Sequence, residues 1–428
     1  MTQTINSSLF TNNRKHLAER LLPNSIAVFN ANDIMPTNAD GTMRFKQNSD
    51  LFYLTGVNQE ETILLIFPDA IEEKNREILF LRETSEYLTI WEGKKLTKEE
   101  AKEATGIQNV QWLSSFDNLF RQLMTNADNI YLNTNEHNRA SVVVESRDLR
   151  FIHHCKELFP LHSYHRLAPI MQNLREIKSP EEIACMRKAC EITEKGFRRI
   201  LKFVKPGVME YEIEAEYAHE FIRNGAGFAD YQAIVASGPS ACVLHYVENN
   251  KACNDGELLL MDTAAGYMNY NADMTRTIPV NGRFTARQRQ VYDAVHRVMK
   301  LSTKFMKPGI TKKEWHDYTE EITTKECVDL GLFTMDEVKN QDKNKPLVKK
   351  YFMHGVGHYL GLDVHDVGDM YAPFRAGNVW TVEPGIYIVE EGIGVRLENN
   401  ILITANGNED LMATIPLDAG EIEELMNA

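Results

Sequence analysis

The sequence lacks any long apolar segment. No run of about 18 apolar residues occurs in it, so it predicts no transmembrane helix. Residues 1–16, MTQTINSSLFTNNRKH, contain no apolar core of the length that a secretory signal peptide requires. We therefore expect a cytoplasmic protein.

Cysteine is also scarce. The chain has six cysteines among 428 residues, and none of them forms a CxxC pair. Small secreted proteins that depend on disulfides carry a far higher proportion, and zinc or redox motifs place their cysteines close together. The pattern is typical of reduced, mostly buried thiols, and it gives no reason to assign them any chemistry.

Basic residues are outnumbered by acidic ones. The chain has 47 Lys and Arg against 61 Asp and Glu, a formal net charge of -14. Such a charge repels phosphate backbones and anionic lipids, so we expect neither nucleic acid nor a membrane as a partner. A hydrophobic content of 43% is ordinary for a globular protein, and 428 residues exceed what one core usually organises. The sequence therefore predicts two domains.

Residues 1–173 alternate short apolar stretches with helical ones, which indicates a small α/β domain. We expect buried strands at residues 25–29, 51–57, 62–67, 77–81 and 129–133, and helices at 13–22 and 97–105. Thr97 and Glu100 have the spacing of a capping box, which favours the start of the second helix.

A second domain, residues 174–428, begins with a long helix. Ser179 suits the N-cap, Pro180 the first helical position, and Glu182 completes a capping box. Farther on, ILKFVKPGVMEYEIE around Gly207 is similar to STKFMKPGITKKEWH around Gly309, and each follows an amphipathic helix that Pro-Gly ends. This similarity predicts an internal duplication, and we expect an α+β domain of two related halves.

Two aspartates lie on either side of a turn-rich segment in the second domain. The apolar run Leu258–Met261 ends in Asp262, GYMNYN follows, and Asp273 opens the return strand. A carboxylate at the end of an apolar strand is costly unless it meets a cation or hydrogen-bond donors. Capping of a turn by either aspartate stays an open alternative.

Three histidines lie close together in HGVGHYLGLDVHDVG. His354 and His358 have the spacing of a zinc-binding helix, but position 355 is Gly rather than Glu, and Gly357 disfavours a helix. The sequence therefore argues against that zinc motif. Together with His365, the two imidazoles still indicate a segment that crowds a ligand.

Two glutamates complete the set of acidic residues. Glu383 follows the apolar run VWTV, and Glu398 lies in VRLENNILI, which is otherwise strand-like. Carboxylates without a thiolate suit Mn²⁺, Co²⁺, Fe²⁺ or Mg²⁺ rather than a structural zinc ion. Four carboxylates are too negative for one divalent ion, whereas two ions balance them and can ionise a shared water into a hydrolytic nucleophile.

These segments resemble a known peptidase family. ADMTRT, HGVGHYLGLDVHDVG, TVEPGIYI and GVRLE are similar to motifs of the family that contains methionine aminopeptidase, prolidase and aminopeptidase P. The resemblance covers residues 174–428 and implies the pita-bread fold, which is built from two related halves. RFKQNSDLFYLTGVNQEE resembles the N-terminal domain of the aminopeptidase P type, a domain that methionine aminopeptidase lacks.

The resemblance implies a site for two divalent metal ions, with Mn²⁺ as the expected ion and Co²⁺, Fe²⁺ or Zn²⁺ as alternatives. The implied metal ligands are Asp262, Asp273, His358, Glu383 and Glu398. Glu383 would also serve as general base and acid. His245 and His365 would donate hydrogen bonds to the developing oxyanion.

The resemblance also implies a pocket for the substrate. His354, Tyr387 and Arg396 match residues that line the proline pocket in the family, although Tyr387 could equally face the core from a strand. The segment IWEGKKL resembles a stretch that places a tryptophan at the active site of a neighbouring subunit, here Trp91. Packing of Trp91 on its own domain stays an open alternative.

The implied function is an aminopeptidase that releases the N-terminal residue from peptides with proline in second position. The alternative is an Xaa-Pro dipeptidase, or prolidase, which shares the fold, the metals and most site residues. The N-terminal motif favours the aminopeptidase. A binding protein without metals is disfavoured, because all five ligands are present. The resemblance further implies a homodimer or homotetramer.

Overall fold

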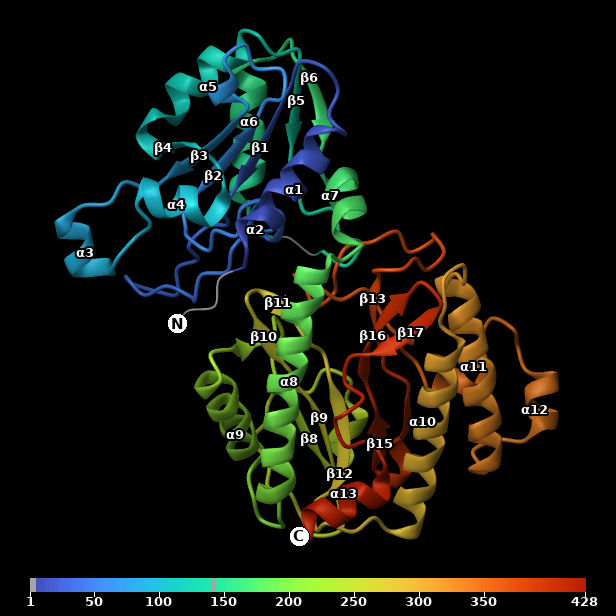
Figure 1. Cartoon of the computed structure of the whole chain (residues 1–428). Coiled ribbons are helices and arrows are strands. Elements are labelled where there is room, and N and C mark those ends of the chain that lie inside the picture. The colour runs from blue at the N-terminus through green and yellow to red at the C-terminus, as the bar shows by residue number, and fades with distance from the viewer. Residues whose placement is uncertain (1–4, 141–142) are drawn as a thin grey trace. The chain divides into compact units, whose positions relative to one another are not determined.

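The computed structural model describes residues 5–140 and 143–428, and its contacts divide the chain into two compact units, Met1–Arg175 and Glu176–Ala428 (Figure 1). Each unit combines helices with β-sheets, which confirms the expected α+β class. Within the described ranges, no helix is both long and apolar enough to cross a membrane.

The N-terminal unit is built on one mixed sheet with the strand order β4-β3-β2-β1-β5-β6. Its strands are β1 (Ser25–Asn30), β2 (Ile63–Ile66), β3 (Glu77–Leu81), β4 (Asn109–Trp112), β5 (Asn129–Leu132) and β6 (Ser163–Arg166). β1 and β3 each pair antiparallel with β2, whereas β5 runs parallel to both β1 and β6, and β4 runs parallel to β3. Four of the five expected strands are confirmed.

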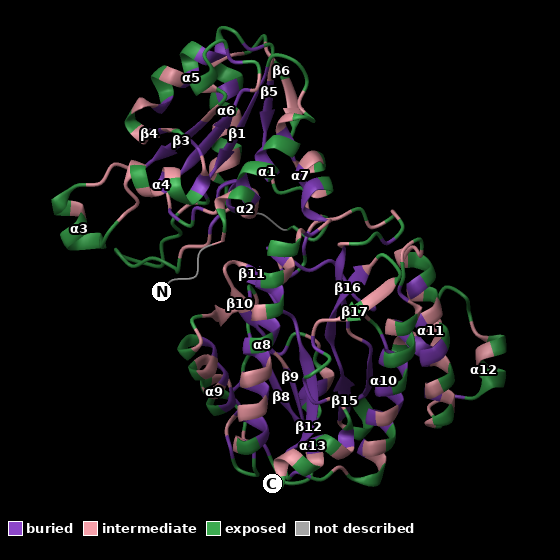
Figure 2. Ribbon diagram, in the orientation of Figure 1, coloured by how far each residue is buried: buried purple, intermediate pink, exposed green. Residues whose placement is uncertain are grey.

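Helices accompany this sheet in the N-terminal unit. They are α1 (Ser7–Ala18), α2 (Ser49–Thr55), α3 (Glu86–Glu92), α4 (Lys98–Thr105), α5 (Phe116–Met124), α6 (Arg147–Leu158) and α7 (Ala168–Arg175). All but α3, which has no buried residue, contribute buried residues. α5 and α6 pack Phe116, Phe120 and Cys155 against Ile26 and Phe80 of the sheet. Figure 2 shows β1 and β3 as buried, β6 as only partly buried, and the outer sides of the helices as exposed.

The expected strand at residues 51–57 is wrong, because this segment forms helix α2. The Asn48 side chain accepts hydrogen bonds from the backbone N–H groups of Asp50 and Leu51, which caps the helix. Gly56 ends it with a φ of 69°. All residues from Leu51 to Thr55 are buried, so the apolar run carries no helical periodicity that could distinguish it from a buried strand.

The C-terminal unit repeats one order of elements. The first half contains α8 (Pro180–Phe203), α9 (Glu210–Arg223), β7 (Gly227–Phe228), β8 (Ile234–Ser237), β9 (Leu258–Asp262), β10 (Ala265–Tyr267), β11 (Tyr270–Asn271) and β12 (Thr275–Pro279). The second contains α10 (Ala286–Phe305), α11 (Lys312–Asp329), α12 (Met335–Asn340), β13 (Val379–Val382), β14 (Gly385–Ile388), β15 (Ile393–Arg396), β16 (Asn399–Thr404), β17 (Gly407–Asp410) and α13 (Ala419–Met426). Short 3₁₀ helices in the chain are η1 (Glu73–Asn75), η2 (Leu113–Ser115), η3 (Gly238–Cys242), η4 (Leu347–Lys350) and η5 (Val389–Glu391).

The two halves share the turn that the sequence similarity predicts. Gly207 and Gly309 follow the first helix of each half with φ angles of 93° and 90°, a backbone conformation that glycine adopts without steric cost. The strands form the small sheets β12-β9-β8, β11-β10-β7, β13-β16-β17 and β14-β15. Figure 1 shows these strands between the helix pairs α8–α9 and α10–α11. One hydrophobic core cluster includes residues of both halves.

A buried ion pair ties the start of this unit to the histidine-rich segment. Lys178 precedes α8, which begins with the expected capping box of Ser179 and Glu182. The Lys178 Nζ lies 2.9 Å from Asp366 Oδ2, and both side chains are 1% exposed. Asp366 is the neighbour of His365, so the pair fixes the loop that carries this histidine.

Replacing Lys178 should destabilise this unit. In Lys178→Met the Asp366 carboxylate stays buried without its ammonium partner, and we expect the free energy of unfolding to fall by about 3–5 kcal/mol. Urea unfolding, followed by the fluorescence of the buried Trp315 and Trp380, measures this free energy of unfolding. The control Lys325→Met breaks an exposed pair and should cost less than about 1 kcal/mol. Equal losses in both variants would contradict a structural role of the buried pair.

Candidate metal centre

The first two candidate ligands come from neighbouring strands of the first half. β9 ends on Asp262, and β12 pairs with it antiparallel so that Thr275 lies opposite Asp262. Asp273 lies two residues before Thr275 and is 5% exposed. The expected strand before Asp262 is confirmed, and antiparallel pairing brings the two aspartates to the same end of the sheet.

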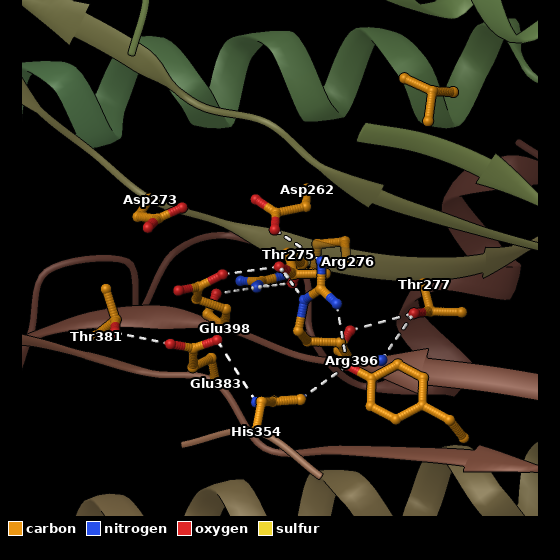
Figure 3. A network of polar contacts seen from close by, with 12 residues as sticks. Asp262, Asp273, Thr275, Arg276, Thr277, His354, Thr381, Glu383, Arg396 and Glu398 are labelled. Atoms are coloured by element: carbon orange, nitrogen blue, oxygen red, sulfur yellow. Dashed lines mark hydrogen bonds and ion pairs between the residues drawn. The ribbon is translucent and has the colours of Figure 1, made fainter. Parts of the chain in front are cut away.

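The two glutamates come from the second half. Glu383 lies between β13 and β14, and Glu398 between β15 and β16. The backbone N–H of Glu398 donates to the carbonyl oxygen of Thr275 at 3.0 Å, which joins this strand end to β12 of the first half. Figure 3 shows the carboxyl groups of Asp262 and Asp273 facing those of Glu383 and Glu398 across one space.

His358 lies in a non-helical segment, as the glycines around it predict. Its backbone N–H donates to Thr381 Oγ1 at 3.0 Å, and its ring Nδ1 lies 2.9 Å from the carbonyl oxygen of Tyr359. Because a carbonyl oxygen only accepts, Nδ1 carries the proton and Nε2 is available as a ligand atom. This Nε2 lies 3.5 Å from Asp273 Oδ2 and 3.6 Å from Glu383 Oε1.

Three of the expected ligands form a group that fits one metal ion directly. Ligand atoms of Asp273, His358 and Glu398 all lie within 4.8 Å of one another, and all three residues are buried. Glu383 adjoins the group through His358. Asp262 lies outside it, and the charge of Asp273 is close enough to influence its pKa.

The electrostatics show that the acidic groups crowd one another. Burial raises the pKa of Glu398 well above its usual value, and the negative charges of Asp273 and Glu383 raise it further. Burial also raises the pKa of Glu383 to about 7, although His358 opposes this shift. Burial raises the pKa of Asp262 too, with Arg396 as the largest opposing influence. Without cations these carboxyl groups would compete to keep protons.

His358 responds in the opposite sense. Burial alone would lower its pKa, but the hydrogen bond with Asp273 and the negative charge of Glu383 together raise it. The raised pKa means that His358 tends to hold a second proton between the carboxylates of Asp273 and Glu383. A divalent cation would replace this proton as the positive charge there.

The residues present fit a pair of divalent metal ions. Asp262 Oδ1 is buried and has no hydrogen-bond partner among the described residues, although its other oxygen accepts from Arg396. An orphaned carboxylate oxygen of this kind calls for a cation. The donor set of carboxylate oxygens and one imidazole nitrogen suits Mn²⁺, Co²⁺, Fe²⁺ or Zn²⁺.

Arg396 connects the acidic centre to two other expected site residues. Its Nη2 donates to Asp262 Oδ2 at 2.7 Å, and its Nη1 donates to the Tyr387 hydroxyl at 3.0 Å. Burial raises the pKa of Tyr387 to about 12, so this phenol keeps its proton. The Tyr387 hydroxyl donates in turn to His354 Nε2 at 2.9 Å, while His354 Nδ1–H donates to the carbonyl oxygen of Gly355.

These hydrogen bonds fix His354 as a neutral ring. Burial and then the positive charge of Arg396 lower the pKa of His354 to about 3. The structure therefore brings His354, Tyr387 and Arg396 together. Tyr387 is 1% exposed, so the expectation that it faces the interior from a strand holds alongside its contact with the site.

The remaining expected residues lie in different places. The His365 ring stands nearly perpendicular to the His358 ring, with centroids 4.3 Å apart. His245 is an exposed residue of the segment between β8 and β9, and its place at the site stays a prediction. Trp91 belongs to α3 of the N-terminal unit, where it is 71% exposed and contacts the Tyr87 ring. Within the described residues Trp91 thus contacts its own domain only at the surface, and its role at a neighbouring active site stays a prediction.

The sequence did not identify three polar residues of the centre. Thr275 Oγ1 donates to Glu398 Oε2 at 2.7 Å and accepts from Arg396 Nε at 3.0 Å. Thr381 holds the backbone of His358. Tyr231 is half-buried, its hydroxyl is buried, and burial together with the charge of Asp273 raises its pKa. The threonines lie within the motifs ADMTRT and TVEPGIYI, whereas nothing in the sequence distinguishes Tyr231.

Comparison with known proteins identifies the family of this chain. Residues 184–405 match the profile of metallopeptidase family M24, and residues 10–131 match the aminopeptidase P, N-terminal domain. The chain is 36% identical to an Xaa-Pro aminopeptidase of Escherichia coli, over 98% of this chain and 97% of that protein. It is 30% identical to human Xaa-Pro aminopeptidase 3, over 89% of this chain and 76% of that protein.

Solved structures agree as well. The chain is similar to aminopeptidase P from E. coli in a low pH form, with a TM-score of 0.90, 34% identity and 99% of both chains covered. It is similar, with a TM-score of 0.88, 35% identity and 99% of both chains covered, to aminopeptidase P from E. coli with the inhibitor Pro-Leu. These neighbours confirm the expected fold. The chain belongs to metallopeptidase family M24.

Proposed function

We propose that this protein is an Xaa-Pro aminopeptidase that uses two divalent metal ions to release the N-terminal residue from peptides with proline in second position. The observation that carries this proposal is the convergence of buried carboxylates and one imidazole from both halves on a single space. The relatives that bear this name match nearly the whole chain, which disfavours the alternative of an Xaa-Pro dipeptidase.

The two domains divide the work in this proposal. Residues 174–428 form the catalytic domain, since every expected metal ligand lies there. Residues 1–173 form the domain typical of aminopeptidase P, in agreement with the matched profile over residues 10–131.

The proposed metal ligands are Asp262, Asp273, His358, Glu383 and Glu398. Ions held by these residues would supply the positive charge that makes a water molecule acidic enough to act as a nucleophile near neutral pH. Glu383 accepts the proton released during attack and returns it to the leaving nitrogen of proline.

Histidines stabilise the reacting carbonyl in this mechanism. His245 and His365 donate hydrogen bonds to the oxyanion as it forms, where they lower the energy of the transition state more than that of the substrate. The bond to proline is a tertiary amide without an N–H, so the ring must be recognised by shape. His354, Tyr387 and Arg396 provide a rigid wall for this purpose, since hydrogen bonds link all three.

Three further properties belong to the proposal. Mn²⁺ is the ion used, since an oxygen-rich site suits it. The protein is cytoplasmic, which agrees with the free state of all six cysteines. It forms a homodimer or homotetramer in which the exposed Trp91 reaches the active site of a neighbouring subunit. Sedimentation equilibrium of the wild type and of Trp91→Ala, together with activity assays of both, tests this last point. A monomer with full activity would refute it.

Substrate length separates the proposed function from the dipeptidase. We expect the tripeptide Gly-Pro-Ala to be cleaved faster than the dipeptide Gly-Pro, because an aminopeptidase leaves the space beyond proline open. Comparison of kcat/KM for the two peptides by release of glycine measures the preference. Gly-Ala-Ala serves as the control for proline recognition. Cleavage of Gly-Pro alone would assign the protein to the dipeptidases.

Metal removal should abolish activity reversibly. Dialysis against EDTA removes the ions that balance the carboxylates, and we expect no measurable turnover of Gly-Pro-Ala afterwards. Of Mn²⁺, Co²⁺, Zn²⁺ and Mg²⁺ added at equal free concentration, Mn²⁺ should restore the highest rate. Full activity in a preparation shown by elemental analysis to be free of these metals would refute the metal mechanism.

Glu383 should be essential for turnover but not for folding. Glu383→Gln keeps the shape of the side chain but removes its ability to accept a proton, and we expect kcat to fall by about 10³-fold or more. Circular dichroism should show unchanged secondary structure. The matched control Glu390→Gln alters an exposed glutamate of the same half that pairs with Lys350, and it should retain full activity. More than a tenth of wild-type kcat in Glu383→Gln would exclude the assigned role.

A further inference from the structure

A buried glutamate outside the metal centre holds both ends of the segment that carries His245. This segment, which we call the His245 loop, comprises residues 238–250, which follow β8 in the chain. His245 is exposed, whereas the next residue, Tyr246, is 7% exposed and packs into a small core with Ile234 and Tyr387. The exposed histidine thus directly precedes a buried anchor, Tyr246.

Glu210, the first residue of α9, accepts four hydrogen bonds and is completely buried. Its Oε1 accepts from the backbone N–H of Ser237 at 2.8 Å and from the Ser237 hydroxyl at 2.7 Å. Its Oε2 accepts from the Tyr246 hydroxyl at 2.8 Å and from the backbone N–H of Lys251 at 2.9 Å. One carboxylate therefore joins the residue before the loop, the anchor within it and the residue after it.

The anchor keeps its role as a donor. Burial raises the pKa of Tyr246 to about 12, and the hydrogen bond and charge of Glu210 act in the same direction. The Lys251 ammonium lies 5.2 Å from the Tyr246 ring centroid and donates to Ser240 Oγ at 2.6 Å, which holds the two limbs of the loop together.

The loop also lies directly against a strand of the metal centre. A Cβ atom added to Gly394 of β15 would come within 2.3 Å of the carbonyl oxygen of Ala241, so only glycine permits this approach. β15 ends on Arg396, which binds Asp262. A displacement of the loop would therefore move His245 relative to the scissile carbonyl.

We propose that Glu210 is a positioning residue that holds His245 in place for the reaction by fixing both ends of its loop. This inference rests on the proposed function, because it assigns His245 a role in stabilising the oxyanion. Glu210 touches neither substrate nor metal ligand and acts only through the loop.

The substitution Glu210→Gln removes this clamp with little change of volume. A carboxylate accepts on both oxygens, whereas an amide offers one oxygen and one NH₂ group. Whichever way the amide turns, its NH₂ faces either the backbone N–H of Ser237 or that of Lys251. Neither backbone group can rotate away, so one end of the loop loses its hydrogen-bond acceptor.

A double-mutant cycle on Gly-Pro-Ala tests the proposal in the full-length, Mn²⁺-loaded protein. We expect Glu210→Gln to lower kcat/KM by about 10- to 100-fold, mainly through kcat, because misplacement of a catalytic group is costly. In a His245→Ala background the same substitution should lower it by less than about twofold. Hydrogen exchange should be faster in Glu210→Gln for peptides that span residues 237–251, while metal content stays unchanged.

The control Glu214→Gln alters the same helix one turn later. Glu214 accepts from the Asn249 side chain at 2.9 Å, and a glutamine oxygen can accept this bond equally well, so activity should stay at the wild-type level. If Glu210→Gln does not fold, Tyr246→Phe removes one of the four donors and should show a smaller loss that also vanishes in His245→Ala.

Three results would overturn the inference while the wild type remains active. They are wild-type kcat/KM in Glu210→Gln, an equal loss with and without His245, and unchanged hydrogen exchange over the loop. Failure of the proposed function has a different signature, because the wild type itself would then not cleave Gly-Pro-Ala.

Discussion

The C-terminal unit depends on compensation of negative charge in its interior. Asp262, Asp273, Glu383 and Glu398 share one buried space, and burial and mutual repulsion raise the pKa of three of them. Arg396 supplies a permanent positive charge, but it contacts only Asp262 directly. Two divalent cations would remove the remaining cost of gathering these groups, and the same charge would activate water for hydrolysis.

The duplicated architecture explains how these groups meet. Each half contributes a pair of carboxylates from the ends of short strands, and β12 joins the halves through hydrogen bonds to residues 396–398. The polar residues around the centre then restrict its geometry. Thr275 lies between Arg396 and Glu398, Thr381 fixes His358, and each is itself fully buried. Behind the loop that carries His365, the buried pair of Lys178 and Asp366 restricts the backbone in the same way.

The sequence predicts most strands and the ligand-bearing segments for a clear reason. Carboxylates that end apolar strands are costly, so Asp262 and Glu383 stand out without any coordinates. The run from Leu51 to Val57 misled the prediction because a wholly buried helix has no polar face. Lys178 with Asp366, and Glu210 with the His245 loop, join residues far apart in the chain, and no local pattern indicates such pairs. The catalytic roles of the histidines, by contrast, came from family resemblance and stay predictions.

Anomalous diffraction tests the central claim most directly. Crystals of the protein grown with Mn²⁺ and measured at the manganese absorption edge should show two peaks, each within about 2.0–2.4 Å of carboxylate oxygens or of His358 Nε2. Refinement should place Asp262, Asp273, Glu383 and Glu398 around these peaks. An anomalous map without a peak among these side chains, with only water between them, would contradict the account.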